Sequence, residues 1–155
     1  MLFLSVLAAC GEAAAPAQNE KTITARPSVN GRLHVEGTKL MDEAGQTVVL
    51  HGVSTHGLTW FPDFINETLF RQISTEWNAN LIRLAMYASQ YCDGYKEESL
   101  TLMRKGIDAA IAADMYAVVD WHILEYGNPN DQLEEAKAFF HADRIGICGC
   151  AEPPV

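Results

Sequence analysis

The sequence predicts an α/β fold in which short parallel strands alternate with helices. Three apolar runs, 47–53, 80–85 and 116–121, each end in His, Trp, Arg or Tyr side chains, and helical patterns separate them. A β-α-β-α-β-α order places such strands in one parallel sheet with right-handed crossovers. Apolar strands that end in polar and aromatic residues are typical of a sheet whose C-terminal strand ends hold a ligand.

The first 28 residues do not share this pattern. Residues 2–9 are a short apolar stretch, well below the roughly 20 residues of a transmembrane helix. They run into Leu-Ala-Ala-Cys-Gly at 7–11, which resembles a bacterial lipobox and predicts that 1–10 is a lipoprotein-type signal, lipidated at Cys10. The alternative is the start of a buried apolar helix. The Ala-, Pro-, Gln- and Asn-rich tract 11–28 favours the signal, because such tracts form flexible linkers.

A β-hairpin is expected to lead into the sheet. Residues 33–42 alternate partly between apolar and polar, and the turn-forming sequence 43–46 then runs into Thr47. The first long strand, 47–53, follows this turn directly.

Three helices are predicted, at 68–77, 98–113 and 132–140. Asn66 is a candidate N-cap for the first of them, because its side chain can accept a hydrogen bond from a free backbone N–H group. Apolar residues at helical spacing should face the sheet. They are Leu69, Ile73, Trp77, Leu102, Ile107, Ala110, Ile111, Leu133, Ala136, Phe139 and Phe140.

Charge and cysteine content narrow the possible partners. The formal net charge of −9 argues against a nucleic-acid partner, because no basic patch could neutralise phosphates. An acidic surface suits an enzyme acting on a neutral polymer, although solubility alone explains it. The four cysteines, at 10, 92, 148 and 150, do not match a zinc-site spacing, and Cys92 is expected to be a lone thiol. No metal and no cofactor is predicted.

Three motifs carry a resemblance to a known family. They are Ser-Thr-His-Gly-Leu-Thr-Trp-Phe at 54–61, Arg-Leu-Ala-Met-Tyr at 83–87, and Asp-Trp-His-Ile-Leu at 120–124 with Gly-Asn-Pro-Asn at 127–130. In this order and spacing, residues 29–140 resemble the start of a bacterial endoglucanase of glycoside hydrolase family 5, the cellulase family. The resemblance implies a TIM (β/α)8 barrel, of which this chain would hold the N-terminal hairpin and the first three βα units. Residues 141–155 do not match the family.

The resemblance implies an endo-β-1,4-glucanase that hydrolyses the O-glycosidic bonds of β-glucan with retention. Retaining enzymes need two carboxylates, one as acid/base and one as nucleophile. In the family these follow strands four and seven, so this chain is expected to be an inactive, truncated fragment. The alternatives are a non-catalytic or vestigial carbohydrate-binding fragment and a relative that acts on mannan or xylan.

The resemblance also assigns roles to polar residues at the strand ends. Arg83 would lie beside the nucleophile and keep it ionised, and the alternative is a strand-end surface salt bridge. His122 would bind sugar hydroxyls next to the cleaved bond and His56 would act similarly, whereas a lone His is otherwise a satisfied core residue. Tyr87 would contribute its hydroxyl. Asp120 is expected to make a buried hydrogen bond.

Two aromatic residues are expected to bind sugar faces. Trp60, with Phe61 beside it, would stack on a glucose ring, and the alternative is an anchor for its loop. Glu125 is expected on the catalytic face of the sheet, but the family places no catalytic acid there. The implied partner is β-glucan, with membrane contact only through a lipid at Cys10. The implied location is the bacterial cell envelope or the extracellular space.

Overall fold

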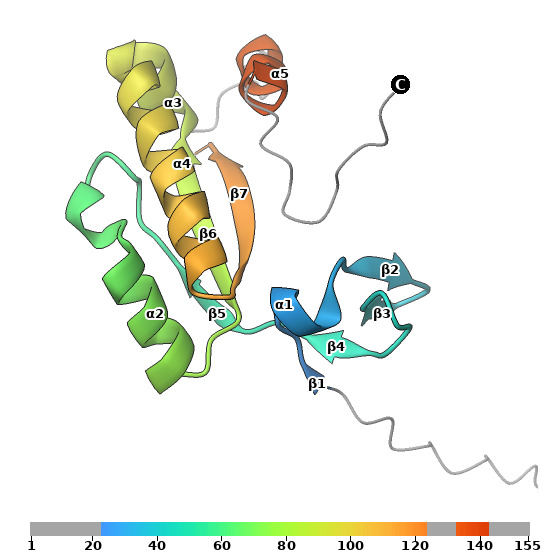
Figure 1. Ribbon diagram of the computed structural model, residues 1–155. Helices are drawn as coiled ribbons and strands as arrows, with labels where there is room; N and C mark the ends of the chain where they lie inside the picture. The colour runs from blue at the N-terminus through green and yellow to red at the C-terminus, as the bar shows by residue number, and fades with distance from the viewer. Residues whose placement is uncertain (1–22, 124–132, 143–155) are drawn as a thin grey trace, which may run out of the picture.

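A three-stranded parallel sheet forms the centre of the fold. The computed structural model describes residues 23–123 and 133–142 (Figure 1). Strands β5 (Gly52–Ser54), β6 (Leu81–Tyr87) and β7 (Tyr116–His122) lie side by side in sequence order. Both pairings are parallel. The predicted α/β class and the order of its three strands are confirmed.

Helices α2 (Glu67–Glu76) and α4 (Lys96–Ala112) cover one face of this sheet (Figure 1). Alternate residues of β6, namely Ile82, Leu84 and Met86, are buried in the core between sheet and helices. This is the period-2 pattern expected of a strand with one face against helices. Three short elements lie in the connections: η1 (Pro62–Phe64), α3 (Ala88–Gln90) and the kinked turn η2 (Tyr91–Tyr95). The last helix, α5 (Leu133–Ala142), packs Phe139 into the same core.

The N-terminal part folds as a small unit against one end of the sheet. It contains β1 (Ile23–Thr24), α1 (Pro27–Asn30), β2 (His34–Glu36), β3 (Lys39–Met41) and β4 (Val48–Val49). Strand β1 pairs in parallel with β4, and β2 pairs with β3 as an antiparallel hairpin. A second core of Ala25, Val48 and Tyr116 joins this unit to the start of β7. The hairpin therefore closes the N-terminal end of the sheet.

The hairpin turn differs from the expected one. The chain turns between β2 and β3, where Gly37 has a φ of 61°, a conformation that glycine adopts without strain. The sequence 43–46 forms a second turn, which brings Thr47 beside Met41. Asp42 holds this turn by accepting hydrogen bonds from the backbone N–H groups of Ala44 and Gln46.

The expected linker 11–28 extends too far. Residues 23–28 form β1 and the start of α1, and Ala25 is fully buried. The Arg26 guanidinium fixes this segment by donating to the Ser74 hydroxyl and to the Ala79 carbonyl, 48 and 53 residues away. Tertiary contacts thus order a stretch whose composition alone indicates flexibility.

The single strand expected at 47–53 is two strands, β4 and β5, that belong to different sheets. The break falls at 50–51, where the fully buried Asn80 side chain takes the place of a strand partner. Its Oδ1 accepts from the His51 N–H group at 2.8 Å, and its Nδ2 donates to the Val49 carbonyl at 2.9 Å. A side-chain amide therefore satisfies the backbone where the chain leaves one sheet for the other.

The helices match the predictions in position but not in every buried residue. The Asn66 side chain caps α2 by accepting from the Leu69 N–H group, as predicted. Trp77, Ile111 and Phe140 were expected to face inward but are 65%, 58% and 37% exposed. Trp77 is the C-cap residue that follows α2, whereas Ile111 and Phe140 lie within α4 and α5 on sides that solvent reaches. None of the helices in the described segments is long and apolar enough to span a membrane.

Candidate functional site

Polar side chains gather on the sheet face that the helices leave open. The strand register sets Ser54 of β5 opposite Arg83 of β6, and Tyr87 of β6 opposite His122 of β7. Asp120 shares this face because it lies two residues before His122. All five side chains therefore approach the C-terminal ends of three adjacent strands.

Arg83 connects the three strands through its guanidinium group. Its Nη1 donates to Ser54 Oγ on β5 at 2.8 Å, and its Nη2 forms an ion pair with Asp120 Oδ2 on β7 at 2.5 Å. The same Nη2 lies 2.9 Å from His122 Nδ1. Since Arg83 is only 35% exposed, these contacts hold its planar head group in one orientation.

The alternative prediction of a strand-end salt bridge is therefore partly right. The Arg83–Asp120 ion pair exists, but its carboxylate is only 22% exposed and lies on the open face of the sheet, within the group of polar side chains. Asp120 is expected to make a buried hydrogen bond; the contacts found for it are a half-buried ion pair with Arg83 and a 3.0 Å approach to His122. Ser54 belongs to the motif 54–61, but the sequence predicted no role for it. The signal that could have found it is its position at the end of a strand next to that of Arg83.

Aromatic rings continue the site beyond the strand ends. The Tyr87 and His122 rings are stacked with their centroids 5.0 Å apart, and Trp60 meets Tyr87 edge-on, also at 5.0 Å. His56 stacks on Trp60 at 4.7 Å and contacts Phe61 edge-on at 5.4 Å. The predicted site residues with described positions thus form one continuous cluster.

Hydrogen bonds to the backbone of β6 hold the loop after β5 close to that strand. The Leu58 N–H group donates to the Ala85 carbonyl, and the Ala85 N–H group donates to the Thr55 hydroxyl. At Gly57 a Cβ atom would lie 3.0 Å from the Tyr87 ring, so glycine permits this approach. Trp60 and Phe61 are each 49% exposed at the outer end of the loop. A ligand could therefore reach both rings.

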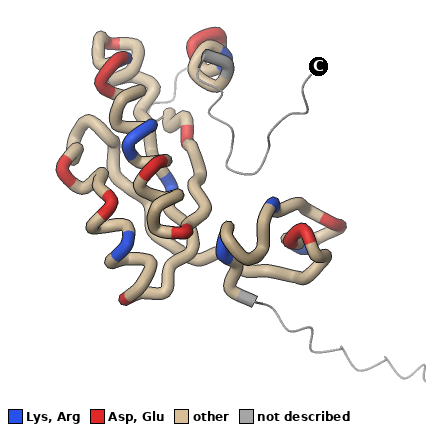
Figure 2. The backbone as a smooth tube through the Cα atoms, viewed as in Figure 1, with Lys and Arg blue, Asp and Glu red and all other residues tan. Residues whose placement is uncertain are grey.

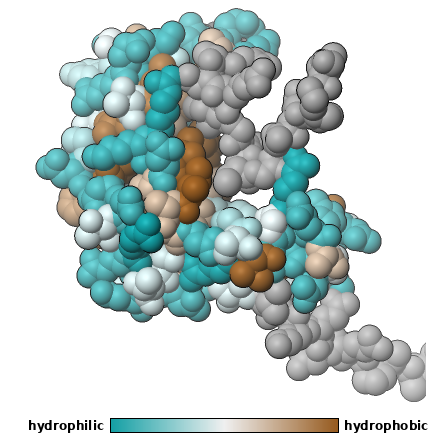
Figure 3. Space-filling model, viewed as in Figure 1, coloured by the Kyte–Doolittle hydropathy of each residue, from teal (hydrophilic) through white to brown (hydrophobic). Residues whose placement is uncertain are grey.

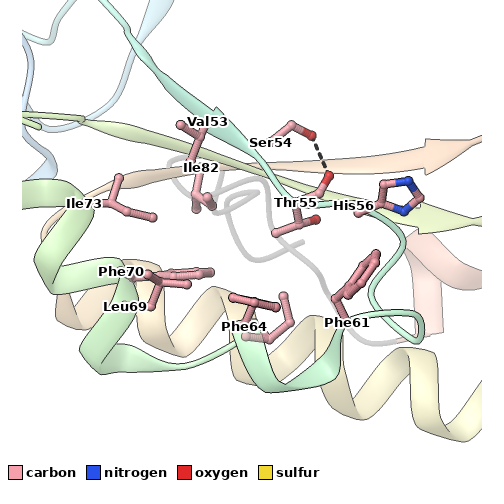
Figure 4. A pocket seen from close by; sticks show the side chains of 11 residues that line it. Val53, Ser54, Thr55, His56, Phe61, Phe64, Leu69, Phe70, Ile73 and Ile82 are labelled. Atoms are coloured by element: carbon pink, nitrogen blue, oxygen red, sulfur yellow. Dashed lines mark hydrogen bonds between the residues drawn. The ribbon is translucent and has the colours of Figure 1, made fainter.

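A largely apolar cavity of about 360 Å³ lies on the other face of β5 (Figure 4). Val53 and Ile82 line it from the sheet, Phe70 and Ile73 from α2, and His56 closes one end. Most of its lining side chains are apolar, although Ser54, His56 and Phe61 of the candidate site also line it. The cavity therefore carries little of the polar chemistry found on the open face.

The charges outside the site are dispersed. Lys and Arg residues lie among acidic ones along the helices in this view (Figure 2). No three His, Cys, Asp or Glu side chains within the described ranges cluster to hold a metal ion. Burial is the main cause that raises the pKa of the Cys92 thiol, the free cysteine of the described part, and nearby acidic residues add to it. Cys10 and Glu125 lie outside the described residues.

Comparison with known proteins gives one consistent result. The sequence model of the cellulase family, glycosyl hydrolase family 5, matches residues 41–145. The chain is 44% identical over 122 residues to cellulase CelDZ1 of Thermoanaerobacterium sp., which is 74% of this chain and 31% of that protein. It is 41% identical over 126 residues to endoglucanase E-5 of Thermobifida fusca, at 76% and 27% coverage. The chain thus spans less than a third of the length of these curated relatives.

Solved structures agree with the sequence comparison. The catalytic domain of Thermobifida fusca endoglucanase Cel5A in complex with cellotetraose superposes with a TM-score of 0.69 at 38% identity. The superposition covers 74% of this chain and 38% of that one. A thermostable, halotolerant cellulase from an Icelandic hot spring isolate gives a TM-score of 0.66 at 43% identity, covering 77% and 36%. The chain belongs to the cellulase family, glycosyl hydrolase family 5.

Proposed function

We propose that this chain forms one wall of the β-glucan-binding cleft of an endo-β-1,4-glucanase. The observation that carries the proposal is the cluster of Arg83, Tyr87, His122 and the His56–Trp60 pair at the C-terminal strand ends. Active sites of (β/α)8 barrels lie at this end of the strands. Family membership and likeness to a cellulase domain that binds cellotetraose support the same reading.

The chemistry of each residue suits a neutral sugar polymer. His56, His122 and Tyr87 offer ring nitrogens and a hydroxyl that can exchange hydrogen bonds with sugar hydroxyls. Trp60 and Phe61 offer half-exposed aromatic faces on which the C–H faces of a pyranose can stack. These two groups together recognise both the polar rim and the apolar faces of a glucose ring.

Arg83 would act at the reacting centre. Its contacts use Nη1 and Nη2, so among the described residues the Nε–H group stays available to a further acceptor. By its resemblance to the family, Arg83 would hydrogen-bond the nucleophilic carboxylate, orient it and keep it ionised. Hydrolysis with retention would then proceed through a glycosyl-enzyme intermediate.

The 155-residue chain by itself is proposed to be inactive. Retaining hydrolysis needs two carboxylates about 5–5.5 Å apart across the bond. Among the described residues the cluster contains one carboxylate, Asp120, and its oxygen already contacts Arg83 and His122. Hydrolysis of carboxymethylcellulose by the purified chain, free of host glucanase, would refute the inactivity.

Cellotetraose binding tests the cleft directly. Titration followed by NMR should shift the resonances of His56, His122 and Tyr87 in the full chain. Trp60→Ala should weaken the shifts at least several-fold, because a stacked ring is lost. Trp77→Ala is the matched control, because Trp77 is 65% exposed at the C-cap of α2, away from the cluster. Equal effects of the two substitutions would contradict the proposed cleft.

Two alternatives are separated by the same titration. A relative that acts on mannan or xylan would bind mannotetraose or xylotetraose more tightly than cellotetraose. A non-catalytic carbohydrate-binding protein would bind cellotetraose, but joining the chain to the remaining strands of a family member would not yield a hydrolase. An active chimaera would exclude this second alternative.

We also propose that the protein is exported and anchored through a lipid on Cys10. The support is the Leu-Ala-Ala-Cys-Gly motif at 7–11 and the polar tract that follows it. Labelled fatty acid should be incorporated into the wild-type protein expressed in a bacterium and not into the Cys10→Ser variant. Incorporation into both proteins would reject the anchor.

A further inference from the structure

One carboxylate oxygen of Asp120 lies close to nitrogen atoms of both Arg83 and His122 in the candidate site. Its Oδ2 is 2.5 Å from Arg83 Nη2 and 3.0 Å from His122 Nδ1, and these two nitrogens are 2.9 Å apart. One carboxylate oxygen thus contacts two of the residues, Arg83 and His122, to which the proposed function gives roles. The distribution of hydrogens within this triangle decides what His122 can offer to a ligand.

The strand register makes the triangle possible. Asp120 lies directly opposite Ala85 in the parallel pairing, and Arg83 is two residues earlier on the same face of β6. Because the Ala85 side chain is a single methyl group, the Arg83 head group can pass over it to reach β7. The contact is therefore fixed by two strands and does not depend on a loop.

The Nδ1 atom of a neutral His122 can either donate or accept a hydrogen bond. A bond to Arg83 requires Nδ1 to accept, whereas a bond to Asp120 requires it to donate. Arg83 can only donate, whereas the Asp120 carboxylate can only accept. If Nδ1 accepted from Arg83, its lone pair would face a carboxylate oxygen 3.0 Å away. If Nδ1 carries the hydrogen, it donates to that oxygen and forms a charge-assisted bond.

Geometry favours the second arrangement. The three distances between Arg83 Nη2, Asp120 Oδ2 and His122 Nδ1 are similar, so every angle of the triangle that they form is acute. The directions from Nη2 to Oδ2 and to Nδ1 therefore differ by less than a right angle. The two N–H bonds of a planar guanidinium nitrogen diverge by about 120°. One N–H bond aimed at the closer, charged oxygen therefore leaves the other pointing well away from His122.

We infer that Asp120 is a positioning residue that holds neutral His122 in the tautomer with hydrogen on Nδ1. The opposite ring nitrogen, Nε2, is then a hydrogen-bond acceptor. Under the proposed function, on which this consequence rests, His122 accepts a hydrogen bond from a sugar hydroxyl and does not donate one. Asp120 orients Arg83 with the same oxygen, so one carboxylate prepares both side chains.

Long-range ¹H–¹⁵N correlation spectra of the full chain, without sugar and at a pH where imidazole is neutral, test the inference. The expected result for His122 is a protonated Nδ1 and an unprotonated Nε2, which have widely separated ¹⁵N shifts. Hydrogen on Nε2, or the averaged shifts of an unconstrained ring, would overturn the inference. Because this measurement uses the wild-type chain, it does not depend on whether a variant folds.

Two variants then identify the cause. In Asp120→Ala the Arg83 Nη2 group would be left facing Nδ1 and would donate to it, so the hydrogen should move to Nε2. Ser54→Ala is the matched control, because it removes the other Arg83 contact but leaves Asp120 beside His122. Retention of the Nδ1–H form in Asp120→Ala, or its loss in Ser54→Ala, would reject Asp120 as the cause.

Added cellotetraose separates this inference from the proposed function. A shift of the wild-type Nε2 resonance on titration supports sugar binding at His122. If the sugar-free spectra show the Nδ1–H form but cellotetraose changes nothing, the proposed cleft is wrong while the Asp120 assignment stands. If the sugar binds and the hydrogen is on Nε2, the cleft stands and the assignment of Asp120 is wrong.

Discussion

Replacing Arg26 with Ala should weaken the attachment of the N-terminal unit to the sheet. The guanidinium donates to Ser74 Oγ at 2.7 Å, to the Ala79 carbonyl at 2.8 Å and to Asn78 Oδ1 at 3.0 Å. These acceptors follow or belong to α2, whereas Arg26 lies between β1 and α1. The side chain therefore joins two parts of the chain that are about 50 residues apart in sequence.

The magnitude follows from the burial of the acceptors. A hydrogen bond to a charged group contributes about 1.5–3 kcal/mol. Ser74 and Ala79 are only 7% and 3% exposed, so we expect the hydrogen bonds to both of them to contribute to stability. Because Arg26 is itself only half-buried, each contribution should lie in the lower part of that range. We expect Arg26→Ala to lower the free energy of unfolding by about 3 kcal/mol, at the lower value for each of two bonds.

Arg71→Ala is the matched control, because it removes the same side chain from an exposed position. Arg71 pairs with Glu67 on α2 at 2.7 Å, but both side chains are more than half exposed, and such pairs contribute roughly 0.5 kcal/mol or less. Urea unfolding followed by tryptophan fluorescence measures both variants. A difference of less than about 1 kcal/mol between them would refute the assignment of Arg26 as the link, given the estimate above.

Three further substitutions test individual elements. Gly52→Ala should disrupt the β5–β6 pairing, because a Cβ there would overlap the Leu81 carbonyl; unchanged amide protection of β5 would contradict this. Asn66→Ala should cost about 1 kcal/mol through the lost α2 cap, as measured by urea unfolding. The Asn30 amide and backbone N–H groups lower the pKa of Asp42, so its stabilising effect is complete above its ordinary pKa and disappears as pH falls through the lowered value. Asp42→Asn should therefore be less stable than wild type at neutral pH, and the gap should narrow below about pH 4; a constant gap would refute the linkage.

The strands were predictable because their signal is local. Apolar runs such as 80–85 and 116–121 lie within one or two residues of β6 and β7, since a strand buried on its helix side needs β-forming residues throughout. The break between β4 and β5 was not predictable, because it depends on the side chain of Asn80, about 30 residues later. A single sequence contains no sign of that pairing.

Exposure at helix edges was predicted less well for a related reason. Helical spacing indicates which side of α4 faces inward, but the width of the buried stripe depends on what lies beside the helix. Ile111 continues the stripe and is nevertheless 58% exposed. Apolar surface lies beside α4 in the space-filling view, at the level of β7 (Figure 3), and Val118 of β7 is 41% exposed.

The residues of the site were found through motifs, but their arrangement was not. The sequence presented a salt bridge and a functional role for Arg83 as alternatives, and the structure places the salt bridge within the candidate site. Pairing with Asp120 offsets much of the positive charge of Arg83, so attraction for another carboxylate would come mainly from the direction of its remaining N–H groups. Direction depends on Ser54 and Asp120 holding the guanidinium from both sides. A lysine would keep the charge but not this planar, two-sided contact, so the site requires the shape of arginine as well as its charge.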